Sequence, residues 1–168
     1  MKKVLLLLVA ALLVFAGYQW LNPTPEKFIR HRLIDLAKAA SFQSSEAPLA
    51  KLANAQMISS FCSQNVEISV DLPGRQTGTV AGRDEVMQGL LASRQAVSSL
   101  SVDFYDITVQ LSPDRESATA NLTVRARTSG DRDDYIQELR FTFQKIEGDW
   151  FIVRVQTIKT LTLILPLP

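Results

Sequence analysis

Cysteine and histidine are almost absent from this chain. Its 168 residues include one cysteine, Cys62, and one histidine, His31. One cysteine cannot form an intrachain disulfide, and these two residues cannot build a multi-cysteine or multi-histidine metal centre. His31 lies between Arg30 and Arg32, where a solvated surface position is expected rather than a catalytic one. The sequence therefore predicts no metal site and no cofactor, and Cys62 is expected to be a small core residue.

The chain also lacks a dominant charge. Lysine and arginine number 18, and aspartate and glutamate number 17, so the formal net charge is +1. A nearly neutral chain has no broad positive field to attract a phosphate backbone, and nucleic-acid binding is not expected. No internal repeat or low-complexity tract interrupts the sequence, and its length suits one folded domain.

The longest apolar run is at the amino terminus. Lys2 and Lys3 precede unbroken apolar residues from Val4 to Ala16, and apolar character continues to Leu21 with Gln19 as the one interruption. A basic start followed by such a run is typical of a membrane-targeting segment, and residues 4–21 are just long enough to span a bilayer. Residues 1–21 are therefore interpreted as a signal anchor or a signal peptide, and residues 22–25 as a short linker.

The two interpretations of this segment predict different locations. A retained anchor, with Tyr18 and Trp20 at the membrane interface, would hold the protein in an inner membrane with its domain in the periplasm or outside. Cleavage near Ala16, which stands with Val14 at the spacing of a cleavage site, would instead release a periplasmic or secreted protein. The sequence favours the anchor but leaves cleavage open.

The rest of the chain changes from helical to strand periodicity. Helices are expected from Pro25 to about Ser41, from about Ser45 to Phe61 with Pro48 in the first turn, and from about Arg83 to Ser99. Strands are expected at 66–72 and 77–81. Alternating runs from 102 to 162, separated by turns at 112–114, 129–131 and 147–149, predict a four-stranded antiparallel meander.

This order of elements predicts an α+β domain over residues 26–162, in which helices cover one face of the sheet. Residues 163–168 form an apolar carboxy-terminal tail.

The domain resembles the nuclear transport factor 2-like superfamily, also called SnoaL-like. The resemblance is carried by the strand and turn from Val66 to Gly74, the helix start Gly82-Arg83-Asp84-Glu85, and the last strand opening with Gly148-Asp149-Trp150-Phe151-Ile152. It implies a cone-shaped roll in which a strongly curved sheet wraps around about three to four helices. It also implies a homodimer formed through the outer sheet face, and a pocket inside the cone that some members use for catalysis and others for binding.

Alternation divides each strand of the meander between two faces. The face expected to meet the helices is apolar: Ile107, Val109, Leu111, Ala120, Leu122, Val124, Leu139, Phe141, Phe143, Phe151, Val153 and Val155. The outer face is polar: Thr108, Gln110, Asn121, Thr123, Arg125, Arg127, Glu138, Arg140, Thr142, Gln144, Arg154 and Gln156. Its charges are expected to form cross-strand ion pairs on a solvated sheet or at a polar dimer contact.

One group of polar residues interrupts the apolar face. If the turns form simple hairpins, Asp103, Tyr105, Tyr135, Gln137 and Lys159 share that face at one end of the sheet. Tyr105, Tyr135, Gln137 and Lys159 are therefore candidate ligand-binding residues, and Asp103 is a weak candidate for a catalytic base. The same cluster is also what a sheet shows where it leaves the helices and meets water.

Two other acidic positions are weaker candidates. Asp71 stands one residue too early for the aspartate-before-proline position of steroid-isomerase-like members, because Leu72 directly precedes Pro73. Asp131, Asp133 and Asp134 lack the spacing of a calcium loop and are interpreted as a charged hairpin tip.

The function favoured by the sequence is binding without catalysis, by an exported or membrane-anchored domain whose partner is a small apolar molecule or an envelope protein. The first alternative is a cofactor-independent lyase, isomerase or hydrolase that uses Asp103 with neighbouring Tyr or Lys residues. The second is a structural subunit of an envelope assembly, suggested by the apolar tail from Leu161 to Pro168.

Overall fold

The computed structural model describes residues 24–71, 77–129 and 134–161. Over these ranges it contains three helices and six strands. In chain order they are α2 (Pro25–Ala40), α3 (Pro48–Ser60), β1 (Cys62–Val70), β2 (Gly78–Ala81), α4 (Arg83–Ala96), β3 (Leu100–Leu111), β4 (Ser117–Thr128), β5 (Tyr135–Ile146) and β6 (Asp149–Leu161).

The strands form one sheet in the order β2-β1-β6-β5-β4-β3. Strands β3 to β6 pair antiparallel with their sequence neighbours, which confirms the predicted meander. Strands β1 and β2, which correspond to the two strands expected at 66–72 and 77–81, pair antiparallel. Strand β1 also pairs with β6 in parallel, so the first described strand is joined to the last one.

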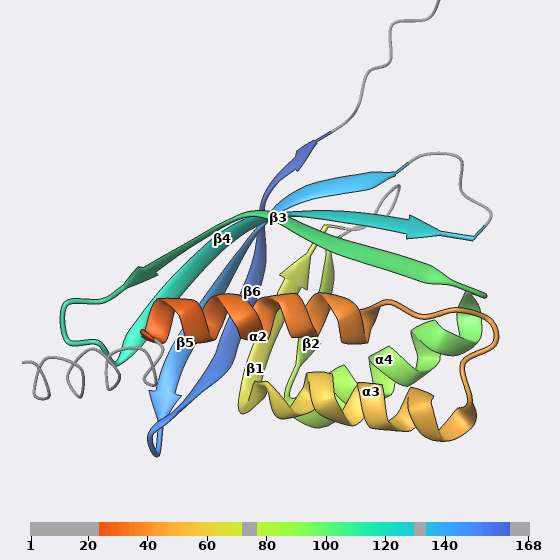
Figure 1. Cartoon of the computed structure of the whole chain (residues 1–168), viewed down its shortest axis with the longest axis horizontal. Coiled ribbons are helices and arrows are strands. Elements are labelled where there is room, and N and C mark those ends of the chain that lie inside the picture. The colour runs from red at the N-terminus through yellow and green to blue at the C-terminus, as the bar shows by residue number, and fades with distance from the viewer. Residues whose placement is uncertain (1–23, 72–76, 130–133, 162–168) are drawn as a thin grey trace, which may run out of the picture.

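All described helices lie on the concave side of the sheet. Figure 1 shows α2 crossing this side, and α3 and α4 side by side near one end. The core lies between the sheet and the helices and includes Ile29 and Leu33 of α2 and Phe141 and Phe143 of β5. This arrangement confirms the predicted α+β class with helices on one sheet face.

The ends of the helices follow from local sequence. Pro25 and Pro48 occupy the first turns of α2 and α3, where a missing backbone N–H costs nothing. Gly82 precedes α4 with φ of 91°, a conformation that favours glycine, and the Glu85 carboxylate accepts a hydrogen bond of 2.7 Å from the backbone N–H of Ala81. The predicted helix start at Gly82 is therefore confirmed.

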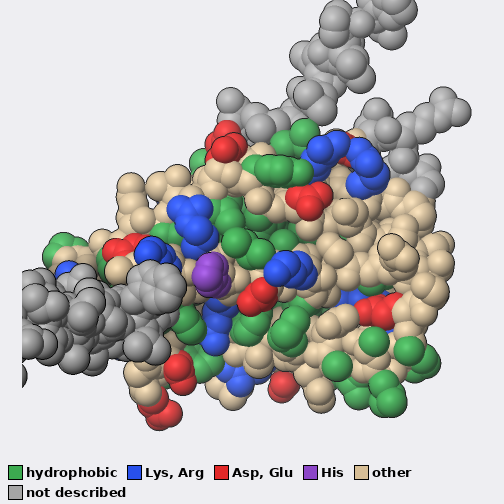
Figure 2. Space-filling view, in the orientation of Figure 1, with side chains coloured by type: hydrophobic (Ala, Val, Ile, Leu, Met, Phe, Trp, Pro, Cys, Tyr) green, Lys and Arg blue, Asp and Glu red, His purple; other side chains and the backbone are tan. Residues whose placement is uncertain are grey.

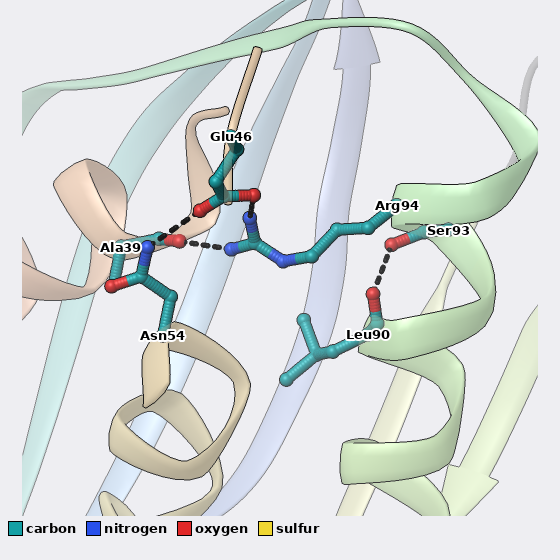
Figure 3. A network of polar contacts seen from close by, with 6 residues as sticks. All are labelled: Ala39, Glu46, Asn54, Leu90, Ser93 and Arg94. Atoms are coloured by element: carbon teal, nitrogen blue, oxygen red, sulfur yellow. Dashed lines mark hydrogen bonds and ion pairs between the residues drawn. The ribbon is translucent and has the colours of Figure 1, made fainter. Parts of the chain in front are cut away.

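A buried polar network joins the three helices (Figure 3). Arg94 of α4 donates to the Glu46 carboxylate at 2.7 Å and to the carbonyl oxygen of Ala39, and its guanidinium lies 4.8 Å from the centre of the Phe42 ring. Asn54 of α3 donates to the other Glu46 oxygen at 2.7 Å. The Arg94 side chain is 1% exposed and that of Glu46 is 10% exposed, so the pair is held away from water.

Strand β1 begins earlier than its alternation indicated. The prediction placed its start at Val66, whereas the strand starts at Cys62, directly after α3. Gln64 and Asn65 are both exposed, and a register shift against β6 lies between Cys62 and Glu67. The first half of β1 therefore shows no period of two from which it could be recognised.

The assignment of β6 to the two faces was partly wrong. Trp150, Ile152 and Val155 are buried against the core, whereas Phe151 and Val153 are not part of it. The register between β5 and β6 shifts between Thr142 and Phe143, because Arg154 pairs with Thr142 and Ile152 with Phe143. Val153 is the extra residue of this bulge, so the buried parity changes within the strand.

The predicted membrane-targeting segment and residues 163–168 lie outside the described residues. Within residues 24–71, 77–129 and 134–161, no helix has the length and apolar character needed to cross a bilayer.

Candidate functional site

The polar residues on the concave face meet where β1 ends. Gln137 is only 2% exposed, and its amide nitrogen donates to the carbonyl oxygen of Asp71 and to the Tyr135 hydroxyl. The Tyr135 hydroxyl donates to the same Asp71 carbonyl at 2.6 Å. Thr157 accepts a hydrogen bond of 3.0 Å from the backbone N–H of Asp71. These contacts fix the chain as it leaves the sheet.

Asp71 contributes its backbone to this cluster, while its carboxylate accepts a hydrogen bond of 2.9 Å from the Thr77 hydroxyl. Tyr135 and Gln137 both direct donors at a carbonyl of the protein itself. The cluster therefore resembles a structural anchor more than a set of groups presented to a substrate.

The prediction that Asp103 and Tyr105 share the concave face was wrong. In the register of β3 and β4, Asp103 pairs with Arg125 and Tyr105 with Thr123, both on the outer face. Asp103 is exposed, and Tyr105 is 45% exposed. The cause is a bulge between Tyr105 and Thr108, where Asp106 adopts φ of 52°. The extra residue reverses the alternation of side chains along the strand. The residues that precede it therefore lie on the face opposite to the one that counting back from the turn predicts.

The structure therefore brings together two of the five predicted residues, Tyr135 and Gln137. The backbone of Lys159 pairs with Glu138, with a register shift directly after it, and the Lys159 side chain lies outside the described part of the structure.

Asp103 and Tyr105 instead border a charged cluster on the outer face. Arg127 donates to both carboxylate oxygens of Asp134, at 2.5 and 2.9 Å, and Arg125 donates to the same carboxylate. The hydrogen bond from Arg127 is the main cause that holds the pKa of Asp134 below its usual value, and the contact with Arg125 adds to it. Of the predicted acidic hairpin tip, Asp134 is described and forms ion pairs, whereas residues 131 and 133 lie outside the description.

Two other outer-face arginines also have partners within the chain, although different ones from those predicted. Arg154 donates to Glu67 of β1 at 2.6 Å, and Arg140 donates to the side-chain oxygen of Asn121 at 3.0 Å. The sequence predicted cross-strand ion pairs among Arg125, Glu138, Arg140 and Arg154 themselves. Arg125 instead pairs with Asp134, the residue directly before β5. Arg154 pairs with Glu67 of β1, the strand that runs parallel to β6.

Two shallow hollows lined by described residues lie on the outer face. One, of about 580 Å³, lies over β1, β5 and β6 between Asn65, Gln144 and Arg154. It sits where β1 and β6 each have a register shift, so the bulges shape it. The other, of about 410 Å³, lies between Tyr105, Arg125 and Ile136. Both are open and border the ion pairs rather than an isolated reactive group.

The solitary histidine and cysteine behave as expected. His31 is exposed on α2, and Cys62 is 2% exposed within the core. Across the described residues, no three histidine, cysteine, aspartate or glutamate side chains gather closely enough to hold a metal ion. Sequence reasoning missed the burial of Arg94, although its place on the apolar face of a predicted helix, in line with Leu90 and Val97, was a signal for it.

Cys62 should be almost unreactive until the protein unfolds. Burial is the main cause that raises the pKa of its thiol to about 11, so little reactive thiolate exists near neutral pH. With iodoacetamide at pH 8, we expect Cys62 to be labelled at least about 100-fold more slowly than a small-molecule thiol, and as fast as that thiol in urea. Rapid labelling of the folded chain would contradict the burial of Cys62.

The fold is that of nuclear transport factor 2-like proteins, a group also described as having a cystatin-like fold. A protein of this type and of unknown function from Pseudomonas putida has a TM-score of 0.64 and 12% identity, over 84% of this chain and 96% of that one. Another, from Novosphingobium aromaticivorans, has a TM-score of 0.53 and 21% identity, over 76% of this chain and 79% of its own. A candidate scytalone dehydratase from the same organism has a TM-score of 0.58 and 17% identity, over 80% of this chain and 82% of its own.

These similarities establish the fold and leave the activity open, since proteins of one fold perform unrelated functions. No protein-family model matches the sequence, and no curated protein matches it.

Proposed function

We propose that this chain is a non-enzymatic binding domain, attached to a membrane by residues 4–21, that forms a homodimer through the outer face of its sheet. The observation that carries this proposal is that the outer face is free of described helices while three of its arginines, Arg125, Arg127 and Arg154, form ion pairs within the chain. An envelope protein or a small apolar molecule is the further partner that such a dimer would bind.

The pairing of charges makes the outer face suitable for contact with a second copy. Arg125 and Arg154 each form an ion pair with an acid of their own chain, Asp134 and Glu67. In a twofold-symmetric interface the same patch meets itself, so unpaired arginines would face arginines and repel one another. Internal pairing removes that repulsion and lowers the cost of excluding water from the face.

The catalytic alternative has lost the geometry that supported it. A dehydratase or isomerase of this fold would need an acid or base inside the cone, and Asp103 was the residue assigned to that role. It lies on the outer face, across from Arg125. On the concave face, Tyr135 and Gln137 donate to the carbonyl oxygen of Asp71. Neither position therefore supplies the acid or base that the catalytic alternative needs.

Replacing Thr142 with arginine is expected to convert the dimer into a monomer. Thr142 is partly exposed on the outer face of β5 and borders the larger hollow. A long cationic side chain there would have to be buried without a partner in the interface, which we expect to weaken dimerisation by at least about tenfold. Sedimentation velocity of a chain beginning at Thr24 measures the effect.

A matched control is Gln88→Arg, which places the same charge on the exposed side of α4, away from the sheet. This variant should sediment as the unmodified chain does. A monomeric unmodified chain at the highest concentration reached would rule out the homodimer, and a dimer insensitive to Thr142→Arg would place its interface elsewhere.

A further inference from the structure

The exposed side of α2 carries basic and apolar residues in a continuous stripe. Its buried side consists of Ile29, Leu33, Leu36, Ala37 and Ala39, which pack into the core. On the opposite side, the exposed residues recur at helical spacing: Lys27, Phe28, Arg30, His31, Ile34, Asp35 and Lys38. We call these seven residues the α2 stripe. Figure 2 views this face and shows Lys and Arg side chains around the histidine, with hydrophobic side chains among them.

The charge of the α2 stripe is predominantly positive. Lys27, Arg30 and Lys38 oppose one acid, Asp35, whose carboxylate lies 3.4 Å from the Lys38 ammonium. Glu26 lies beside the stripe in the first turn of α2, where the helix dipole favours an acid. Among the described residues, neither Lys27 nor Arg30 forms an ion pair with an acid, so their charge is available to an external anion.

Two hydrophobic side chains in the stripe are also open to solvent. Phe28 is 37% exposed and Ile34 is 38% exposed. The guanidinium of Arg32 lies between two aromatic rings, 5.1 Å from the centre of the Phe28 ring and 4.8 Å from the centre of the Phe61 ring. Cations interleaved with exposed apolar residues along one helical side are the pattern of a helix lying in a membrane interface.

The position of α2 in the chain places it next to the proposed anchor. Helix α2 begins at Pro25, and the apolar run ends at Leu21. Four residues reach at most about 14 Å, so the start of α2 cannot be farther than that from the end of the run. The attraction of basic residues by anionic lipids acts over about 10 Å at physiological salt. Only a helix that lies along the surface keeps Lys38 within this range, since α2 is roughly 24 Å long.

We propose that the α2 stripe docks on a bilayer surface rich in anionic phospholipid, with Lys27, Arg30 and Lys38 against the phosphates and Phe28 and Ile34 at the headgroup boundary. This inference rests on the membrane attachment proposed above. It adds an orientation to that attachment, because docking of the α2 stripe places α2 between the sheet and the lipid and leaves the outer sheet face away from it.

The test measures the accessibility of position 34 in the full chain, reconstituted into lipid nanodiscs. Ile34→Cys provides a thiol in the stripe, and Gln88→Cys provides a matched exposed thiol on α4. The native Cys62 is buried and contributes little labelling, so it also reports whether each variant is folded. A neutral maleimide labels the thiols in discs of phosphatidylcholine alone and in discs that also contain phosphatidylglycerol.

With phosphatidylglycerol, we expect Ile34→Cys to be labelled about tenfold more slowly than in phosphatidylcholine alone, and Gln88→Cys to be labelled equally in both. Adding Lys27→Gln, Arg30→Gln and Lys38→Gln to the Ile34→Cys chain should restore fast labelling, as should 1 M salt, which shortens the screening length to about 3 Å.

The outcomes separate the two proposals. A chain that does not copurify with the discs would refute the membrane attachment. A chain that copurifies but shows equal labelling of Ile34→Cys in both lipids would overturn the docking of α2 and leave the attachment standing. Slow labelling that persists after the three cations are neutralised would also overturn it, since the contact would not depend on anionic lipid.

Discussion

Replacing Arg94 with alanine is expected to lower the free energy of unfolding by about 3–5 kcal/mol, measured by urea denaturation of a chain beginning at Thr24. The substitution leaves the Glu46 carboxylate, 10% exposed, without its cation, and leaves the Ala39 carbonyl without its donor. It also removes a cation that packs on the Phe42 ring. Because these groups join the helices to one another, the loss should appear as a lower midpoint of one cooperative transition.

The control for this prediction is Arg154→Ala, since Arg154 forms an ion pair with Glu67 in which both side chains are more than half exposed. Its effect should stay within about 1 kcal/mol. Replacing Arg94 and Glu46 together with leucine should recover much of the loss, because no charge is then left buried. A loss below about 1 kcal/mol for Arg94→Ala would show that water reaches the network.

Phe143→Ala is expected to have an effect of similar size, about 3–5 kcal/mol. Phe143 is fully buried, and its ring stacks on that of Phe141 with centroids 6.5 Å apart. It lies on the concave face among the residues that fill the space between the sheet and the helices. Removing the ring leaves a cavity that the surrounding core residues can close only in part.

Ile146→Ala on the same strand is the matched control, since Ile146 is 38% exposed and a small effect is expected. The comparison also tests how the interior is occupied. If Phe143 bordered an open ligand cavity, its removal would enlarge existing space and cost well under the full range. A full-sized loss supports a cone whose interior near Phe143 is filled by its own side chains.

The architecture could be predicted because periodicity reports burial. The apolar residues of β4 and β5, among them Leu122, Val124, Leu139 and Phe141, alternate without interruption, and these two strands pair without a register shift. Their faces were assigned correctly for that reason. The same count placed Gln137 on the concave face, where it is buried.

The candidate site could be predicted less accurately than the architecture, because the strands that carry it contain bulges. The Asp106 bulge has no glycine to mark it, although its φ of 52° is uncommon for a residue with a side chain. One extra residue there moved Asp103 and Tyr105 from the expected concave face to the outer one. The partners of Arg94 and Arg154 could not be predicted from the sequence either. Each arginine pairs with an acid that is distant along the chain, at separations of 48 and 87 residues.

The parallel pairing of β1 with β6 constrains the order in which the chain can fold. Cys62 pairs with Ile152 and Ser69 with Gln156, so β1 gains its central neighbour only when the end of the domain is present. Contacts so distant in sequence make folding slow, because a long loop must close before they form. During synthesis from the amino terminus, the segment up to β2 would emerge while its partner strand is still unmade. Completion of the sheet must therefore wait until the chain through β6 has been made.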